Sequence, residues 1–248
     1  MRALVTGASS GLGLAVCREL ARRGFAIVGC SRHEGDFRAL REEFPAGDFE
    51  YIEADLSSAE GRNRLLNSTQ GIDFDLYFVN SGFGCFGSFM HAELDAREAE
   101  MAELNCISSH LLIKEFLRRA VKARKGRVMV TASASAFASA PYMSAYYATK
   151  AYIYHLCLGY QRELQGMKTR VTLSILCPGP VATRFEETGK LKFQIKPMKA
   201  EKVASYAVKK WLSGKKVIVP GILMKFGRIG AKLVPDTLVT KFTKRAAE

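Results

Sequence analysis

The sequence predicts an α/β fold in which helices cover both faces of a parallel β-sheet. Short apolar runs of strand length alternate with amphipathic helical segments along most of the chain. The first of these runs leads directly into a glycine-rich loop and a helix. No repeat and no low-complexity linker interrupts the alternation, so one domain is expected.

The composition is that of a globular protein with ordinary apolar content. The chain has 248 residues, which is long enough to bury a large core. It contains neither a long apolar run nor an apolar leader after Met1, so no transmembrane helix and no signal peptide are expected. The six cysteines form no C-x-x-C pair, which favours buried reduced thiols and a cytoplasmic location. The four histidines show no ligand spacing, so no metal is expected.

The net charge of +13 is carried almost entirely by the last quarter of the chain. From residue 190 onward there are fifteen Lys or Arg and three Asp or Glu, whereas residues 1–189 are nearly balanced. A basic character confined to the tail argues against a nucleic-acid-binding role for the whole protein.

The first predicted strand, Arg2 to Thr6, is followed by a loop that holds three glycines. Glycines let backbone N–H groups approach phosphate oxygens, and the N-terminus of the next helix adds partial positive charge. A glycine loop alone can be only a turn, but between a strand and a helix it is typical of a dinucleotide site. The residues expected at the cofactor here are Thr6, Gly7, Ser9, Ser10, Gly11, Leu12 and Gly13.

The end of the second predicted strand, Phe25 to Cys30, indicates which dinucleotide binds. An acidic residue usually holds a ribose 2′-hydroxyl there, about 20 residues beyond the glycines. This chain has Ser31, Arg32 and His33 instead. A hydroxyl and a guanidinium suit a 2′-phosphate, so NADP(H) is preferred over NAD(H). Arg32 as a plain surface charge is the alternative.

The next predicted elements are a helix over 35–44, a strand over 49–53, a helix over 58–70 and a strand over 74–79. Polar residues occur where these strands end. Asp55, followed by Leu56, offers an acid to the adenine amino group. Asn80, Ser81 and Gly82 form a second turn that can bring backbone close to the cofactor.

A long helix is predicted from Ala96 to Arg124, with Asn105 inside it. Asn has a poor helix propensity, and its side chain competes for backbone partners. Asn105 is therefore either a solvated polar position or the support of a local irregularity.

Tyr146 and Lys150 stand four positions apart at the start of a helix predicted to run to Gln165. This spacing places both side chains on one helix face. An ammonium favours the phenolate, so Lys150 is expected to lower the pKa of Tyr146 toward a range useful for acid–base chemistry. Because Tyr and Lys meet at this interval by chance in many helices, the interpretation also depends on the glycine loop and on Ser133, which follows a strand predicted over 126–131.

Together these residues resemble the short-chain dehydrogenase/reductase family over about residues 2–219. The resemblance is carried by Thr6-Gly7-(x)3-Gly11-x-Gly13, Asp55, Asn80-x-Gly82, Asn105, Ser133, Tyr146-(x)3-Lys150 and, after a strand predicted over 170–176, Pro178-Gly179-(x)3-Thr183. It implies a Rossmann-type doubly wound sheet of seven parallel strands in the order 3-2-1-4-5-6-7.

The resemblance implies catalytic roles for four residues. Tyr146 is the acid–base residue, and Ser133 hydrogen-bonds the substrate oxygen. Lys150 binds the nicotinamide ribose and lowers the Tyr146 pKa, and Asn105 anchors a water that links Lys150 to solvent. Hydride transfer to a carbonyl leaves charge on oxygen, and donors aimed at that oxygen stabilise it.

Further cofactor contacts are implied after the sixth strand. The residues expected there are Pro178, Gly179, Val181 and Thr183. Two neighbours of the catalytic residues are set aside as decoys. Tyr147 is three rather than four residues from Lys150 and leans to another face, and Ser135 lies two positions beyond the family's serine.

The expected function is NADPH-dependent hydride transfer between the nicotinamide and a carbonyl or secondary alcohol of a small-molecule substrate. An NAD-dependent alcohol dehydrogenase is one alternative, and a non-catalytic NADP(H)-binding sensor that works through the basic tail is another. A homodimer or homotetramer is implied, paired through the helices that hold Asn105 and Tyr146.

Substrate specificity is expected from residues near Phe83 to Phe86 and from the loop over 184–199. The loop interleaves the apolar residues Phe185, Phe193, Ile195 and Met198 with Lys190, Lys192, Lys196 and Lys199. An apolar lid with basic residues suits an apolar substrate that bears an anionic group, although a solvated lysine face over a packed stripe has the same pattern.

The catalytic domain is expected to span 1–221, with 222–248 as a basic helical extension of the same domain. Apolar residues recur at helical spacing beside a basic flank, namely Ile222, Phe226, Ile229 and Leu233 beside Lys225, Arg228 and Lys232. A second short basic helix is predicted over 237–245. Three interpretations stay open: packing on the parent domain or a partner subunit, a peripheral membrane helix that prefers anionic lipid, and nucleic acid without sequence specificity.

Overall fold

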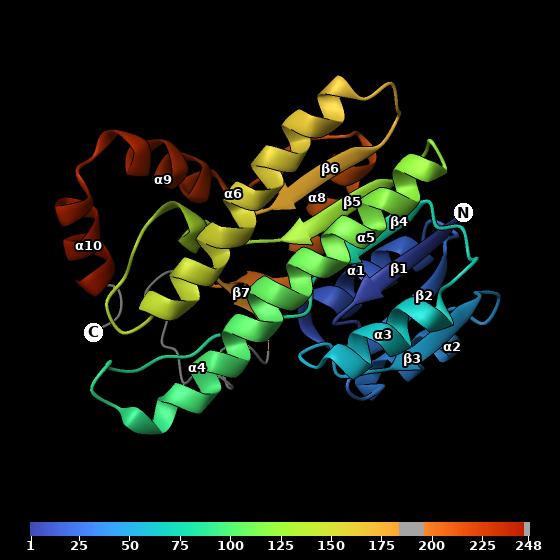
Figure 1. Ribbon diagram of the computed structural model, residues 1–248, viewed down its shortest axis with the longest axis horizontal. Helices are drawn as coiled ribbons and strands as arrows, with labels where there is room; N and C mark the ends of the chain where they lie inside the picture. Colours follow the sequence, from blue (N-terminus) through green and yellow to red (C-terminus); the bar gives the residue numbers. More distant parts are fainter. Residues whose placement is uncertain (184–195, 246–248) are drawn as a thin grey trace.

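A parallel seven-stranded sheet forms the centre of the molecule, in the strand order β3-β2-β1-β4-β5-β6-β9 (Figure 1). The structure is a computed structural model and describes residues 1–183 and 196–245. The short strands β7 and β8 pair with each other in a separate sheet, so β9 is the seventh strand of the main one. The predicted strand order and the doubly wound α/β fold are thereby confirmed.

The strands of the main sheet are β1 Arg2–Thr6, β2 Ala26–Ser31, β3 Phe49–Glu53, β4 Leu76–Val79, β5 Arg127–Thr131, β6 Thr172–Leu176 and β9 Val217–Ile218. The helices are α1 Gly11–Ala21, α2 Ala39–Glu43, α3 Ala59–Ser68, α4 Asp95–Ala102, α5 Ser109–Lys122, α6 Ser144–Gly166, α8 Ala200–Leu212, α9 Ile222–Leu233 and α10 Asp236–Arg245. The shorter elements are the 3-10 helices η1 Gly35–Arg38, η2 Ala92–Leu94 and η4 Ala134–Phe137, the π-helix η3 Glu103–Ser108, and the strands β7 Val181–Ala182 and β8 Met198–Lys199.

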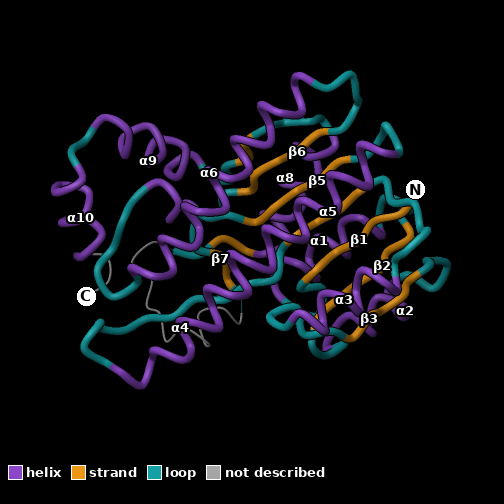
Figure 2. Tube along the Cα trace, viewed as in Figure 1, coloured by secondary structure: helices purple, strands orange, loops and turns teal. Residues whose placement is uncertain are grey.

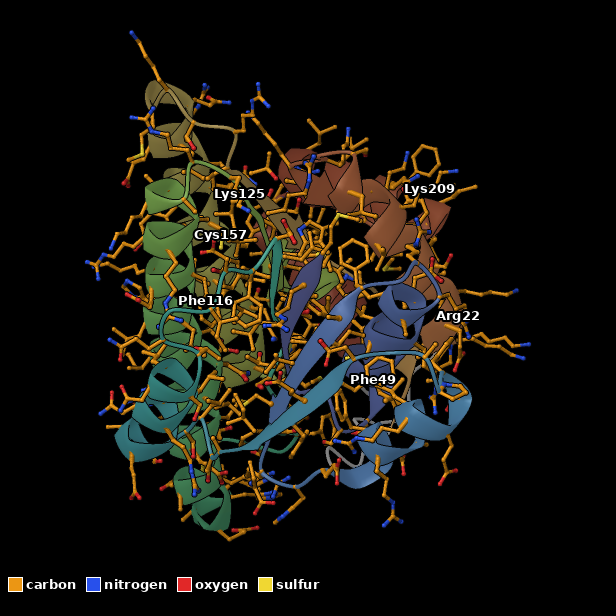
Figure 3. All side chains as sticks on the ribbon, turned by 90° about the vertical axis from the view of Figure 1, so that its right-hand side faces the viewer. Arg22, Phe49, Phe116, Lys125, Cys157 and Lys209 are labelled. Carbon is orange, nitrogen blue, oxygen red and sulfur yellow. The ribbon has the colours of Figure 1, made fainter. Side chains whose placement is uncertain are left out.

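Two hydrophobic cores lie on opposite faces of the sheet. One packs the sheet against α3, α5 and α6, and the other packs it against α1, α2 and α8. Figure 3 shows Phe116 and Cys157 on one side of the strands and Phe49 on the other. Alternate residues of each central strand enter alternate cores, with Leu4 in the first and Val5 in the second, so the middle of each of these strands is apolar on both faces.

All six cysteines are free, and all but the half-buried Cys106 are buried. Burial raises the pKa of the Cys30 thiol to about 12, because the thiolate loses its hydration. The predicted buried thiols are therefore confirmed. Within residues 1–183 and 196–245, no helix is long and apolar enough to cross a bilayer, and no three His, Cys, Asp or Glu side chains cluster as metal ligands would.

The carboxyl ends of the parallel strands meet at one edge of the sheet, where the connecting loops gather (Figure 2). In an open α/β sheet this edge is where ligands bind. The motif residues lie there because each directly follows a strand: Gly7 after β1, Arg32 after β2, Asp55 after β3, Asn80 after β4, Ser133 after β5 and Pro178 after β6.

The long predicted helix is present but irregular at its centre. The π-helix η3 joins α4 to α5 without a break in the chain, and Asn105 lies within it and is 1% exposed. A π-turn widens the helix, and such turns are frequent at functional sites. Of the two interpretations of Asn105, the structure shows the local irregularity and not the solvated position.

The two C-terminal helices pack at the same edge of the molecule (Figure 1). The Arg228 guanidinium of α9 donates a hydrogen bond to the Tyr154 hydroxyl, 3.1 Å away, and stands 5.5 Å from the centre of the Phe137 ring. In α10 the Thr243 hydroxyl donates to the Ser139 carbonyl oxygen at 2.8 Å. One side of the tail therefore packs on the parent domain.

Candidate active site

The glycine turn after β1 leaves space that a ligand backbone or phosphate could fill. Gly7 and Gly11 have φ angles of +66° and +54°, in the left-handed region that L side chains rarely adopt. A Cβ at Gly13 would collide with the Gly7 carbonyl. The Ser10 side chain makes no capping hydrogen bond at the start of α1, so the first N–H groups of that helix stay available to an anion. This turn fits a dinucleotide pyrophosphate.

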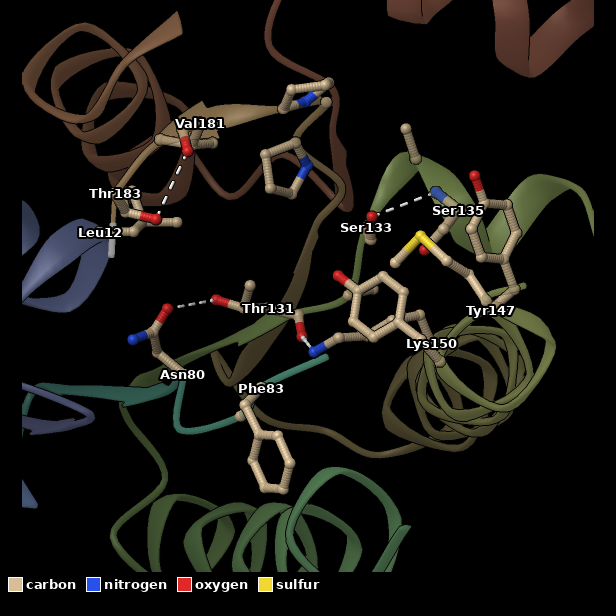
Figure 4. Close-up of a pocket in the computed structure, with 18 of the residues that line it drawn as sticks. Leu12, Asn80, Phe83, Thr131, Ser133, Ser135, Tyr147, Lys150, Val181 and Thr183 are labelled. Carbon is tan, nitrogen blue, oxygen red and sulfur yellow. Dashed lines mark hydrogen bonds between the residues drawn. The ribbon is translucent and has the colours of Figure 1, made fainter. Parts of the chain in front are cut away.

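Thr6 lies behind the turn and joins two strand ends. Its hydroxyl oxygen accepts hydrogen bonds from the backbone N–H groups of Asn80 at 2.9 Å and Ser81 at 3.2 Å. The Thr131 hydroxyl donates to the Asn80 side-chain oxygen at 2.9 Å (Figure 4). The ends of β1, β4 and β5 are thereby held together. Thr6 and Gly13 support this edge but do not line the cavity above it.

The end of the cavity near β2 carries Ser31, Arg32 and Asp55. The Arg32 side chain is 61% exposed and lies 3.6 Å from the Glu100 carboxylate, which makes a loose ion pair. Asp55 accepts hydrogen bonds from the backbone N–H and the hydroxyl of Ser57 at 3.0 and 2.7 Å. Burial opposes ionisation of Asp55, but the Ser57 hydrogen bonds and the Arg32 charge outweigh it and lower its pKa. A cation and a carboxylate are thus both present where the adenosine half of a dinucleotide would lie.

Ser133, Tyr146 and Lys150 come together at the carboxyl ends of β5 and β6. The Lys150 ammonium lies 5.8 Å from the centre of the Tyr146 ring and donates to the Thr131 carbonyl oxygen at 3.3 Å. Ser133 has extended backbone, and its hydroxyl oxygen accepts the Ser135 N–H at 3.1 Å (Figure 4). A hydrogen bond also joins the Ser133 and Tyr146 side chains. The three predicted side chains therefore face one cavity.

The expectation that Lys150 lowers the Tyr146 pKa is wrong for this structure. Burial raises the pKa of Tyr146 to about 12, and the hydrogen bond with Ser133 only partly offsets that rise. Burial also lowers the pKa of Lys150 to about 8. Both shifts have one cause, because each charged form would be removed from water. Loss of hydration outweighs the attraction on which the prediction was based.

Asn105 supports this group from behind. Its side-chain nitrogen donates to the Phe83 carbonyl oxygen at 2.9 Å and to the Thr149 hydroxyl at 3.1 Å, and its oxygen accepts the Phe83 N–H at 3.2 Å. A Cβ at Gly82 would lie 2.6 Å from that oxygen and 3.4 Å from the Lys150 nitrogen. Asn105 does not line the cavity, but it fixes the turn beside Lys150.

One continuous cavity of about 830 Å³ connects these groups. The predicted residues that line it are Gly7, Ser9, Ser10, Gly11, Leu12, Ser31, Arg32, Asp55, Leu56, Asn80, Ser81, Gly82, Ser133, Tyr146, Lys150, Pro178, Gly179, Val181 and Thr183. Its volume and apolar walls are those of a small-molecule site.

Tyr147 and Ser135, which the sequence analysis set aside from the catalytic roles, lie closer to the site than predicted. Both line the same cavity as Tyr146. Ser135 is buried, and its side chain, like that of Ser133, interacts with the Tyr146 hydroxyl and lowers the Tyr146 pKa. Position on the helix or beyond the strand was the only basis for excluding them, and the walls of the cavity curve around both.

Sequence reasoning missed the wall formed by the C-terminal helices. It is made by Met224, Gly227, Arg228, Gly230, Ala231, Val234, Val239 and Thr243. The small residues Gly230 and Ala231 follow Gly227 by three and four positions, so all three lie on one helix face. This spacing is the sequence feature that could have predicted the wall. Residues 184–195 of the predicted lid over 184–199 lie outside the described residues, and Met198 and Lys199 at its end form β8 beside β7.

The fold and the cavity together define a class of protein. A doubly wound parallel sheet with a glycine turn after β1 and a tyrosine, lysine and serine at the far end of one cavity is the architecture of a nucleotide-dependent oxidoreductase. The family model for short chain dehydrogenases matches residues 1–192. The chain therefore belongs to the short-chain dehydrogenase/reductase family of NAD(P)-binding oxidoreductases, as the motifs predicted.

Individual relatives are distant. The uncharacterized oxidoreductase YbbO of Escherichia coli strain K12 is 28% identical over 241 residues, which cover 96% of this chain and 86% of that protein. The NADPH-dependent 1-acyldihydroxyacetone phosphate reductase of Saccharomyces cerevisiae is 30% identical over 185 residues, or 73% of this chain and 61% of that protein. A short-chain dehydrogenase from Sphingobium yanoikuyae, solved in complex with NADPH, has the same fold, with a TM-score of 0.82, 23% identity and coverage of 94% and 93%.

Proposed function

We propose that this protein is an NADPH-dependent carbonyl reductase that also oxidises the corresponding alcohol. The observation that carries the proposal is the convergence of Ser133, Tyr146 and Lys150 in the cavity that begins at the glycine turn. A sensor that only bound the cofactor would have no use for this set of side chains.

The chain's own residues would hold the cofactor and handle the proton. The glycine turn would take the pyrophosphate, and Lys150 would face the nicotinamide ribose. Bound there, the nicotinamide supplies or accepts the hydride. Tyr146 donates its phenolic proton to the carbonyl oxygen as charge develops on it, while Ser133 donates a hydrogen bond to the same oxygen. The high pKa of Tyr146 keeps the phenol protonated at neutral pH, which suits reduction.

Replacing Tyr146 by Phe tests this function. The variant keeps the ring and loses the proton donor, so turnover should fall by about a hundred- to ten-thousand-fold. NADPH affinity, measured by titration of nucleotide fluorescence, should change little. The wild type should also be assayed with NADPH on a panel of ketones and aldehydes. Tight NADPH binding without turnover of any carbonyl compound would favour the sensor function.

The preference for NADPH over NADH is supported by Arg32 at the end of β2. Its guanidinium is mostly exposed, and its partner Glu100 is loosely held, so a 2′-phosphate can compete for it. Arg32→Ala should weaken NADPH binding roughly 10- to 100-fold, the loss expected for charge-assisted hydrogen bonds. NADH binding should be unchanged. Equal loss for both nucleotides would mean that Arg32 does not read the 2′-phosphate.

A bulky apolar substrate fits the cavity walls. Aromatic and thioether side chains surround the catalytic end, namely Phe83, Phe86, Phe137, Met143, Tyr147 and Met224. The substrate in the name of the yeast relative carries an acyl chain, which agrees with such walls. Turnover of long acyl or bulky aromatic ketones should exceed that of small neutral aldehydes, and equal activity on both would contradict the assignment.

A further inference from the structure

Five large apolar side chains of α9 face away from the protein. They are 58% to 78% exposed and lie at Ile222, Leu223, Phe226, Ile229 and Leu233. Four of these positions recur at intervals of four, three and four, so they form one stripe along the helix. A helix that packs on a domain normally turns such a stripe inward. Here it is the outer surface.

The opposite face of α9 forms part of the cavity wall. Met224, Gly227 and Ala231 line it, and Arg228 is held by the Tyr154 hydroxyl and the Phe137 ring. Turning the apolar stripe inward would break these contacts and replace small residues with large ones beside the substrate space. The outward orientation of the stripe is therefore built into the packing of the helix.

Basic groups flank the stripe. The helix contains three basic residues and no acidic one. The ammonium groups of Lys225 on α9 and Lys210 on α8 lie 5.6 and 6.0 Å from the centre of the Tyr206 ring, which places two cations at this border. A second copy of the chain that covered the stripe with its own would bring like charges together. An anionic lipid surface is complementary to both features, since its acyl chains can contact the apolar stripe and its headgroups can bind the flanking cations.

We propose that the outer face of α9 lies on an anionic lipid bilayer, with its exposed apolar side chains at the acyl boundary and Lys225 among the headgroups. The same helix then has lipid on one side and the cavity on the other. Given the proposed reductase function, an apolar carbonyl dissolved in the membrane would reach Tyr146 past α9 without crossing bulk water.

Sedimentation with vesicles tests the surface. The full chain should bind vesicles that contain phosphatidylglycerol at low salt, bind pure phosphatidylcholine at least tenfold less, and lose most binding at 0.5 M salt. Replacing Phe226 and Ile229 together by Gln should reduce vesicle binding at least tenfold. Phe89→Gln is the matched control, because that side chain is 94% exposed far along the chain from α9 and should not change binding.

Two results would overturn the proposal. One is equal vesicle binding by the wild type and the double variant. The other is self-association of the wild type, seen by sedimentation velocity, that the double variant abolishes without any lipid binding, because a second copy would then be the occupant.

The reductase function is tested separately. The double variant should reduce a water-soluble ketone at the wild-type rate, since neither residue lines the cavity, and it should lose several-fold in rate on an apolar ketone presented in anionic vesicles. Vesicle binding without turnover of any ketone would contradict the proposed function and leave the lipid surface standing. Equal rates of both proteins on the vesicle-borne ketone would overturn delivery from the membrane.

Discussion

At the scale of single residues, Lys150 is buried at a position where its positive charge destabilises the folded state. The side chain is buried, and its pKa is lowered from 10.5 to about 8 by loss of hydration. Its ammonium has the Thr131 carbonyl as a hydrogen-bond acceptor, which is less than water would give it. Function and stability therefore conflict at this position.

The conflict predicts a specific dependence of stability on pH. Below about pH 8, Lys150 is protonated in both states and the full cost of the buried charge is present. Between pH 8 and 10.5 the folded protein holds Lys150 neutral while the unfolded chain is still protonated, so the free energy of unfolding rises with pH. The limiting slope is about 1.4 kcal/mol per pH unit.

Lys150→Met removes this contribution and isolates it. The variant's stability advantage over the wild type, measured by urea unfolding, should shrink by about 3 kcal/mol as pH rises from 8 to 10.5, the product of the shift and that slope. Titrating groups that do not interact with Lys150 cancel in the difference. A difference that stays constant with pH would mean that Lys150 is not desolvated.

At the scale of elements, the π-turn of η3 acts as a support for the active-site turn. The Asn105 side chain satisfies both the N–H and the C=O of Phe83. These backbone groups lie four residues beyond the end of β4, and the loop that carries them passes beside Lys150. A regular α-helix would turn residue 105 to a different angle, so the irregularity is what brings the amide to the loop.

Asn105→Ala should therefore lower both stability and turnover. Loss of the amide leaves the two partly buried backbone groups of Phe83 unpaired, at roughly 1–3 kcal/mol each, and lowers Tm by on the order of 10 °C. Asn105→Asp keeps the acceptor for the Phe83 N–H. Its Tm, measured by calorimetry, should lie between those of the wild type and the alanine variant. An alanine variant as stable as the wild type would show that water replaces the amide.

The sequence predicted these elements unevenly, for physical reasons. Strand order and the position of the site were predictable, because each motif residue follows a buried apolar run and parallel strands end at one edge. The Tyr146 pKa was not, since burial depends on residues far along the chain. The π-turn was anticipated only as one of two outcomes, because a buried and a solvated Asn105 have the same local sequence.

At the scale of the whole molecule, η3, α5 and α6 present a further exposed apolar surface. Ile107, Leu111 and Tyr152 are exposed on it, and His110 joins the two helices through the Tyr152 hydroxyl at 2.7 Å and the Tyr160 hydroxyl at 3.1 Å. The predicted homo-oligomer would bury this surface.

Leu111→Glu should therefore weaken self-association, because the carboxylate would be buried against an apolar partner surface. Sedimentation velocity should show a shift toward monomer for this variant. Met90→Glu changes another exposed apolar residue and should leave the assembly intact. If both variants sediment like the wild type, the subunits meet elsewhere.

The tail shows what helical spacing alone leaves undetermined. The stripe through Phe226 and Ile229 was recognised from sequence, but its outward direction depends on Arg228 meeting Tyr154 and Phe137, which lie more than seventy residues earlier. Periodicity reveals that a helix has two faces. Partners elsewhere in the chain decide which face meets the protein.

The glycine face of α9 is expected to set the size of the substrate. Gly227 lines the cavity, and a Cβ added there would meet open space. Gly227→Leu should fill part of the cavity and raise KM at least tenfold for a bulky apolar ketone, with little change for a small aldehyde. It should also stabilise the helix by about 1 kcal/mol, because leucine has a higher helix propensity than glycine.

Gly159→Leu is the matched control, since Gly159 is exposed on α6, also has open space around it and does not line the cavity. It should give a similar gain in helix stability and leave both KM values unchanged. Steady-state kinetics on the two substrates separates the outcomes. If Gly227→Leu changed KM for the large and small substrates equally, the tail would not form the wall that selects between them.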